Sequence, residues 1–192
     1  MLGKDIIKHA REFSRYIRDF KYEETDTGIL FPEAKTRIAG LYEDHLGQTP
    51  NLIPTQGLNH ILDVAISDEA KLTNFYLALY SGNYTPVAGL TAASFAGDAT
   101  EITSTSEGYT GANRIAWLPA NPASGVIDNY ASKAAFTIQT ATTLDILGAA
   151  LLSAQTRGAT SGVIISAAKF ATTRTENNAN VYNLGFRITS TG

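Results

Sequence analysis

The first part of the chain has apolar residues spaced as on one side of an α-helix. Between residues 4 and 20 they recur at steps of three and four, as Ile6, Ala10, Phe13, Ile17 and Phe20. Basic residues fall nearly opposite this stripe, namely Lys4, Lys8, Arg11, Arg15 and Arg18. The spacing predicts an amphipathic helix, which ends at the acidic residues and the glycine between positions 23 and 28.

The next part of the chain predicts a connector and a second helix. Residues 28–54 contain prolines at 32, 50 and 54 and a short apolar run at 36–42, which indicates an extended connector with one strand. Thr55 is a candidate N-cap for the helix that follows. We expect the buried side of this helix to consist of its spaced apolar residues, Leu58, Ile61, Leu62, Ala65 and Ile66.

Beyond residue 70 the hydrophobic period changes to the alternation that is typical of β-strands. In residues 180–189 the apolar Tyr182, Leu184, Phe186 and Ile188 alternate with polar or small residues, as in a half-buried antiparallel strand. Further short apolar runs predict strands at 74–82, 100–103, 112–118, 133–139, 143–152 and 162–170. Clusters of Gly, Ser, Thr, Asn and Pro separate these runs.

These patterns together predict a mainly β protein. We expect an antiparallel β-sandwich or jelly-roll-like domain with an N-terminal amphipathic helix arm and one further short helix. The expected division of the chain is a helical arm at 1–27, an extended connector at 28–54, and a helix plus β-sandwich domain at 55–192.

Composition narrows the classes of protein to consider. Of the 33 charged residues among 192, 17 lie in residues 1–44, and the net charge of −3 gives no global electrostatic reason to bind nucleic acid. The absence of cysteine excludes disulfides and thiolate metal sites and fits folding in a reducing cytoplasm. The apolar run from Ile146 to Leu152 is too short to span a bilayer, so we expect no membrane partner.

The sequence contains no motif of a known catalytic or phosphate-binding site. His60 and Asp63 are a possible metal or acid–base pair, but no third ligand lies near them in sequence. We interpret Asp145, in an apolar strand, as a hydrogen-bonded strand-end or bulge residue rather than a catalytic acid. The sequence leaves open a catalytic pair of carboxylates, as in glycoside hydrolysis, because two such residues can be distant in sequence and meet only in the fold. The candidates are Asp98, Glu101, Glu107, Asp128, Asp145 and Glu176. We therefore expect that the protein is not an enzyme and that it binds no cofactor and no metal.

The apolar stripe of residues 6–20 is the sharpest candidate for binding a partner. A helix that is apolar on one side must dock on its own domain or on another chain, and the connector favours another chain. The basic side, including Arg11, Arg15 and Arg18, offers contacts to phosphates or anionic lipid, but the helix also carries Asp5, Glu12 and Asp19. We therefore interpret the basic side as solvated or paired with acidic neighbours.

From Pro50 onward the chain resembles proteins encoded in the structural modules of tailed bacteriophages. The segments that carry the resemblance are PNLIPTQGLNHILDV (50–64), NFYLALYSGNYTPV (74–87), GDATEI (97–102), GYTGANRIAW (108–117), AAFTIQTATTLDILGAALLSA (134–154) and GVIISAAKF (162–170), together with the closing strand. The resemblance implies a virion component, most naturally a capsid decoration or cement protein.

Such a role implies particular partners and leaves alternatives open. The expected partners are the major capsid protein and copies of this chain in a symmetric homo-oligomer, with the N-terminal arm laid on a neighbouring subunit. A tail or neck component is the alternative within the structural class. A carbohydrate-binding host-recognition module is a third possibility, with stacking faces from Tyr76, Tyr80, Tyr84, Tyr109 and Trp117.

Overall fold

The computed structural model describes residues 22–24, 30–32 and 37–191 of the chain. It divides into one unit of residues 1–37 with Gly192 and a compact body of residues 38–191. In the first unit, β1 (Tyr22–Glu24) pairs antiparallel with β2 (Leu30–Pro32), and Tyr22 lies opposite Pro32. β1 falls within the segment 1–27 expected as a helical arm, whereas the apolar stripe of that arm lies outside the described residues.

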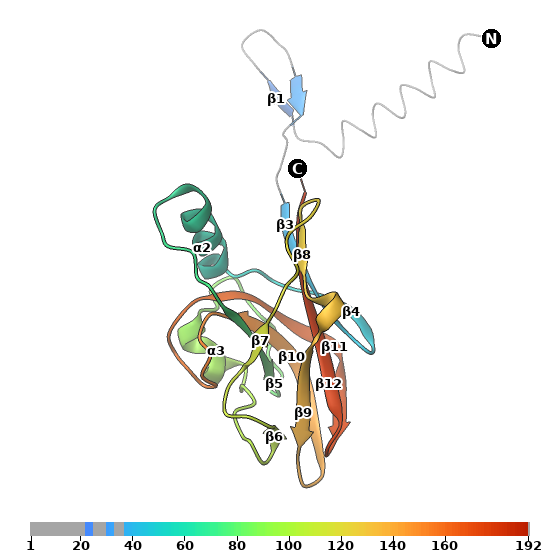
Figure 1. The fold of residues 1–192 in the computed structure, drawn as a ribbon. Coiled ribbons are helices and arrows are strands. Elements are labelled where there is room, and N and C mark those ends of the chain that lie inside the picture. The colour runs from blue at the N-terminus through green and yellow to red at the C-terminus, as the bar shows by residue number, and fades with distance from the viewer. Residues whose placement is uncertain (1–21, 25–29, 33–36, 192) are drawn as a thin grey trace, which may run out of the picture. The chain divides into compact units, whose positions relative to one another are not determined.

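The body is mainly β, as predicted, and its strands form two sheets (Figure 1). The first sheet has the order β11–β10–β5–β7, and its strands are β5 (Phe75–Tyr80), β7 (Ile115–Trp117), β10 (Thr143–Leu152) and β11 (Ile164–Asn177). In register, β10 runs antiparallel to both β5 and β11. The long predicted strand at 143–152 is therefore central in its sheet.

The second sheet has the order β4–β3–β12–β9–β6, and β8 also pairs with β12. Its strands are β3 (Arg37–Asp44), β4 (Gly47–Pro50), β6 (Gly108–Tyr109), β8 (Val126–Asp128), β9 (Ala134–Gln139) and β12 (Val181–Thr191). A short 3₁₀ turn (Tyr130–Ser132) precedes β9. The closing strand β12 runs antiparallel to β8 and β9.

Residues from both sheets make the main hydrophobic core. Along β9 and over residues 181–184 of β12 buried residues alternate with exposed ones, and Phe136, Ile138, Tyr182 and Phe186 are buried. This alternation agrees with the period-two pattern of the sequence, because successive side chains of a strand point to opposite faces. The prediction of a half-buried strand near 180–189 is confirmed.

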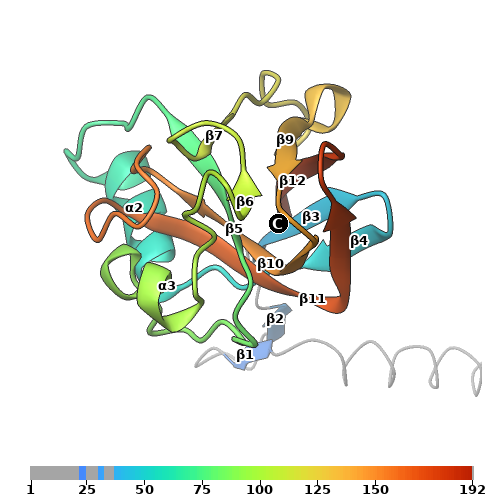
Figure 2. The same ribbon diagram turned by 90° about the horizontal axis from the view of Figure 1, so that it is seen from below.

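The first sheet is buried on both faces. Leu77 and Leu79 of β5 enter the main core, whereas Ala78 and Tyr80 enter a second cluster with Phe95. Phe95 belongs to α3 (Ala92–Asp98), and Figure 2 shows α3 and α2 (Thr55–Ile66) on the side of this sheet, away from β3, β4 and β12. Burial on both faces explains why β10 reads as a continuous apolar run rather than an alternating one.

Several elements differ from those expected. The strand expected at 36–42 is present as β3, but residues 38–50 form most of the β3–β4 hairpin of the body instead of an extended connector. Residues 100–103 make an isolated bridge at Glu101 instead of a strand, and β11 runs on to Asn177. α3 was not predicted, although Thr91 caps it by accepting a hydrogen bond from the Ser94 backbone N–H at 3.3 Å.

Candidate interaction surface

The helix α2 buries a different side from the one that the sequence predicted. Gly57 and His60 are its buried residues, and Ile61 and Val64 are half-buried. Four residues expected to be buried are exposed instead: Ala65 and three large apolar residues, Leu58 by 40%, Leu62 by 54% and Ile66 by 82%. We call these three residues the outer face of α2. They follow at steps of four, so they lie along one side of the helix.

Close packing against β11 decides which side of α2 is buried. A Cβ atom added to Gly57 would lie 2.7 Å from the carbonyl oxygen of Ile165 and 2.8 Å from that of Ile164. The side-chain oxygen of Gln56 accepts hydrogen bonds from the backbone N–H groups of Ala92 (2.9 Å) and Ile164 (3.1 Å). Glycine and glutamine thus attach α2 to β11 and α3, which hydrophobic spacing alone does not reveal.

The start of α2 also differs from the prediction. The N-cap position is Pro54, with extended backbone angles, and no side chain caps the helix there. Thr55 is the first helical residue. A proline just before the first turn suits a helix start, because the first N–H groups of a helix have no partner within it.

An apolar cavity of about 240 Å³ opens beside the buried side of α2. Its wall includes Phe75 and Trp117 from the first sheet and Ile188 from the second, with Ile61 and Val64 of α2 at one side. We call it the α2 cavity. Ile61 lies between the cavity and the outer face of α2 on the helix circumference, so apolar side chains extend from one to the other.

His60 adds one polar atom to the wall of the α2 cavity. Its side chain is 7% exposed, and its Nδ1 atom has no hydrogen-bond partner, although Oε1 of Glu69 lies 3.4 Å away. The imidazole also packs edge-on to Phe75, with ring centroids 6.3 Å apart. The sequence suggested that His60 and Asp63 could act as a pair. In the structure the carboxylate beside Nδ1 of His60 is instead that of Glu69.

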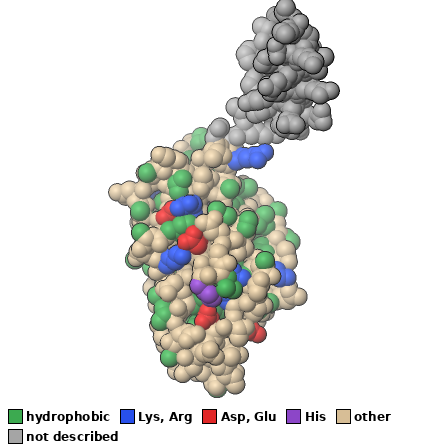
Figure 3. Space-filling view, turned by 90° about the vertical axis from the view of Figure 1, so that its right-hand side faces the viewer, with side chains coloured by type: hydrophobic (Ala, Val, Ile, Leu, Met, Phe, Trp, Pro, Cys, Tyr) green, Lys and Arg blue, Asp and Glu red, His purple; other side chains and the backbone are tan. Residues whose placement is uncertain are grey.

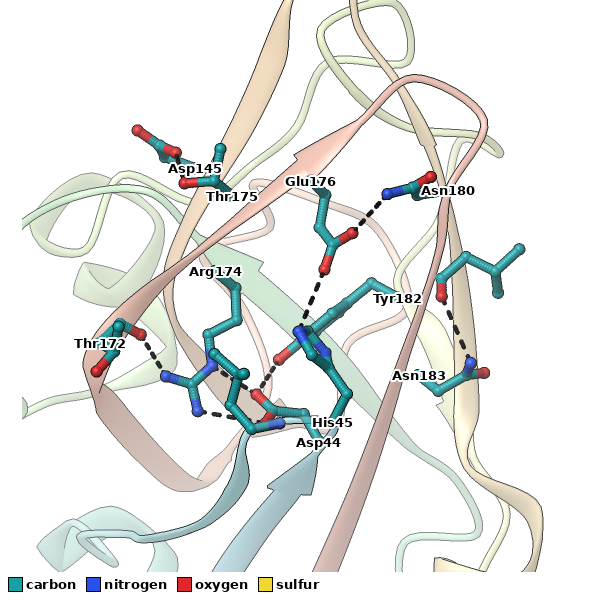
Figure 4. A network of polar contacts seen from close by, with 12 residues as sticks. Asp44, His45, Asp145, Thr172, Arg174, Thr175, Glu176, Asn180, Tyr182 and Asn183 are labelled. Atoms are coloured by element: carbon teal, nitrogen blue, oxygen red, sulfur yellow. Dashed lines mark hydrogen bonds and ion pairs between the residues drawn. The ribbon is translucent and has the colours of Figure 1, made fainter.

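A second hollow, of about 420 Å³, is polar and lies near the end of β11 and the start of β12. Figure 4 shows His45 directed toward Glu176, with Nε2 and Oε1 3.9 Å apart. Asn180 donates a hydrogen bond of 3.0 Å to the other oxygen of Glu176. His45 is more than half exposed, so this contact is a weak surface interaction rather than a fixed catalytic pair.

Beneath this hollow a buried carboxylate is held by two donors. Arg174 Nε donates to Oδ2 of Asp44 at 2.7 Å, and the Tyr182 hydroxyl donates to the same oxygen at 2.8 Å (Figure 4). Burial alone would raise the pKa of Asp44, but hydrogen bonds from Arg174, Tyr182 and the Leu46 backbone N–H, with the charge of Arg174, hold this pKa below its ordinary value. Burial raises the pKa of Tyr182.

A second buried ion pair joins two sequence segments that are separate along the chain. Arg114, from GYTGANRIAW, donates from Nε and Nη2 to the two carboxylate oxygens of Glu101, from GDATEI, each at 2.7 Å. The Gly158 backbone N–H also donates to Glu101, at 2.9 Å. Both side chains are almost fully buried, and neither Glu101 oxygen is left for a substrate. These motif residues serve the framework.

Arg157 fixes the loop between this ion pair and β6. Its guanidinium lies 3.5 Å from the centroid of the Tyr109 ring and donates to backbone carbonyl oxygens, including those of Ser104 at 3.0 Å and Tyr109 at 2.9 Å. Cations over aromatic rings and charged donors to carbonyls are strong interactions in a buried setting. The sequence offered no signal for this arginine, because the acceptors of its hydrogen bonds are backbone atoms.

The structure also settles where several chemical candidates lie. Asp145 is exposed near the start of β10 and accepts a hydrogen bond of 2.6 Å from Thr175 (Figure 4), so its interpretation as a hydrogen-bonded strand-end residue is confirmed. Tyr80, Tyr109 and Trp117, three of the five aromatic residues considered as a sugar platform, are buried. Among the described residues, no three His, Asp or Glu side chains are grouped to hold a metal ion.

Charges of both signs are interspersed on the surface of the body that Figure 3 shows. In the described part of the chain, no helix has the length and hydrophobicity needed to cross a membrane. The residues of the arm that were predicted to bind a partner lie outside the described residues. They are Ile6, Ala10, Phe13, Ile17, Phe20, Arg11, Arg15 and Arg18. The chain matches no protein-family model and no curated protein.

Proposed function

We propose that this protein is a non-enzymatic structural component of a tailed-bacteriophage particle, a decoration or cement protein of the capsid. The observation that carries the proposal is the outer face of α2, where Leu58, Leu62 and Ile66 are exposed beside the open α2 cavity. Contiguous exposed apolar surface is typical of protein–protein contact sites. The phage assignment comes from the sequence resemblance, and the exposed surface supports an assembling rather than a catalytic role.

The body suits a protein that acts through its surface. Its two sheets form a sandwich-like unit that contains two buried ion pairs, Glu101–Arg114 and Asp44–Arg174. In this proposal the stripe at residues 6–20 forms an amphipathic helix and places Ile6, Phe13 and Ile17 on neighbouring subunits. The partners are the major capsid protein and further copies of this chain, and the protein resides in the virion.

Co-sedimentation with mature capsid shells that lack this protein tests the proposal. The full chain is compared with a variant that begins at Gly28, and bound copies per shell are counted. Saturable binding on the order of hundreds of copies, weakened by the truncation, is the expected result, because symmetry repeats each weak contact over the shell. Failure of both proteins to bind shells would reject the decoration role. A stoichiometry of about a dozen copies, found instead on connector or tail structures, would favour the neck or tail alternative.

A further inference from the structure

The apolar surface at α2 needs an occupant, and the chain itself contains one of matching character. The outer face of α2 presents Leu58, Leu62 and Ile66 at steps of four, which form one ridge on the helix. The stripe at residues 6–20 also lies along one side of a helix, at steps of four and three, and carries two phenylalanines. Two helices with such ridges pack by fitting the ridge of one into the groove of the other.

The α2 cavity strengthens the match. Its volume of about 240 Å³ and its apolar wall, with Phe75, Trp117 and Ile188, accommodate an aromatic side chain. An aromatic ring that leaves water for such a site gains from its large apolar area, and interfaces are centred on side chains of this kind. A helix laid along the outer face of α2 would bring its phenylalanines beside the cavity mouth, because Ile61 connects the two.

Charge favours the same pairing. Residues 4–21 carry six Lys or Arg and three Asp or Glu, whereas the body from 38 to 191 carries seven Lys or Arg and eleven Asp or Glu. The end of α2 and the loop after it contain Asp63, Asp68 and Glu69 against the single base Lys71. A basic segment approaching an acidic body is steered toward it and oriented by it.

The connection between the two units indicates which copy supplies the segment. Because Tyr22 pairs with Pro32, the chain leaves the β1–β2 hairpin at the end where it entered. Residues 33–36 then lead to β3, and four residues span at most about 14 Å. Short connections of this kind favour the exchange of the joined segment between copies over its closure within one chain.

We infer that residues 6–20 of one copy dock on the outer face of α2 and the α2 cavity of a second copy. The inference rests on the proposed function, since it names the partner of the same surface. In this arrangement the homo-oligomer forms because each copy places its N-terminal segment on the body of another copy. The stripe would then bind copies of this chain, and attachment to the shell would involve other surfaces of the assembled oligomer.

The absence of cysteine in the sequence allows a sharp test by engineered cross-linking. A full-length chain with Ile17→Cys is mixed with a mass-tagged full-length chain with Leu62→Cys, and mild oxidation is followed by mass analysis. Two matched controls are Arg15→Cys, on the opposite side of the predicted helix, and Thr142→Cys, exposed in the turn between β9 and β10. We expect the Ile17–Leu62 pair to cross-link between chains about tenfold more than either control pair, because disulfides require close Cβ atoms.

Two results would overturn the inference. One is a cross-linking yield for Ile17–Leu62 no higher than for Arg15–Leu62 or Ile17–Thr142. The other is a chain carrying both Ile17→Cys and Leu62→Cys that closes within itself at high dilution and forms no mixed dimer. Neither experiment includes shells, so failure here leaves the decoration role standing, and failure of shell binding leaves the exchange standing.

An independent measurement uses sedimentation equilibrium of the full chain. Leu62→Glu and Phe13→Glu are each expected to raise the dissociation constant of the oligomer at least about tenfold, as for central interface side chains. The double variant should be little weaker than either single variant, since both changes remove the same contact. Leu62 is exposed, so the variant is expected to keep its fold. Unchanged association in both single variants would contradict the exchange.

Discussion

Arg114 and Glu101 form a two-point ion pair inside the body, with Nε and Nη2 of the arginine each 2.7 Å from one carboxylate oxygen of the glutamate. The remaining guanidinium nitrogen, Nη1, donates to the carbonyl oxygen of Ala154 at 2.9 Å. The pair thereby fixes three segments that are distant in sequence. Loss of one partner would leave a buried charge without compensation.

Replacement of Arg114 by Met is therefore expected to lower the free energy of unfolding by about 3–5 kcal/mol. Urea denaturation followed by circular dichroism measures the change. Arg187→Met is the matched control, because Arg187 pairs with Asp128 at 2.7 Å but both side chains are partly exposed. The control should cost at most about 1 kcal/mol. Equal losses in the two variants would contradict a special role for the buried pair.

Gly148 in β10 is expected to tolerate no side chain. A Cβ atom there would overlap Cζ of Tyr80 and the carbonyl oxygen of Ala168, and the Tyr80 hydroxyl donates to that same carbonyl at 2.9 Å. Gly148→Ala should lower the free energy of unfolding by about 1–3 kcal/mol or more, because an overpacked core must shift its backbone. Thermal unfolding followed by circular dichroism provides the measurement.

A matched control for Gly148 exists in α3. Gly97 has open space around the position of an added Cβ and lies inside the helix. Gly97→Ala is expected to raise the free energy of unfolding by about 0.5–1 kcal/mol, since alanine favours the helical backbone. Destabilisation by both alanine substitutions would show that the Tyr80 contact does not explain the effect at Gly148.

The body is expected to lose stability in acid through Asp44. The folded-state pKa of this carboxyl lies below its ordinary value, since hydrogen bonds and the charge of Arg174 outweigh burial. Its contribution is therefore complete above about pH 4–5 and is lost as the pH falls through the folded-state pKa. Urea unfolding at several pH values should show the free energy of unfolding falling below about pH 4.

Two variants separate Asp44 from other carboxylates in this titration. Asp44→Asn should lower stability at neutral pH and flatten the acid dependence, and Tyr182→Phe should flatten it less because Arg174 remains. Glu43 and Asp128 also have lowered pKa values, chiefly from the Gln48 hydrogen bond at Glu43 and, against burial, from the Tyr130 N–H and Arg187 at Asp128. Some acid dependence should therefore persist in Asp44→Asn. An unaltered pH profile in that variant would refute the assignment.

His60 is expected to be replaceable by an apolar residue. Its buried Nδ1 atom lacks a hydrogen bond, and the wall around it is apolar. A buried polar atom without a partner costs about 1–3 kcal/mol, so His60→Leu should leave the free energy of unfolding unchanged or raise it by up to that amount. Denaturant unfolding at pH 7 measures it, with Glu69→Gln as the control for the 3.4 Å contact. Marked destabilisation in His60→Leu would mean that the imidazole is satisfied in solution.

The sequence by itself determined those helices and strands whose hydrophobic residues recur at a regular spacing. The alternation at 180–189 predicted β12, because Tyr182, Leu184 and Phe186 of that strand enter the core, and the spacing at 55–66 located α2. The continuous apolar run at 143–152 predicted the strand β10. The stripe at residues 6–20 predicts a partner, which the proposed cross-linking examines.

Tertiary structure alone decided which faces are buried and which charges meet. The outer face of α2 has the same hydrophobic spacing as a core face, yet Gly57 packs on β11 and turns Leu58 and Leu62 outward. Glu101 and Arg114 are ordinary charged residues in sequence, and only the fold places them 2.7 Å apart inside the body. The physical reason is common to both cases: periodicity records how a segment divides its own side chains, whereas burial and pairing depend on surfaces supplied by distant segments.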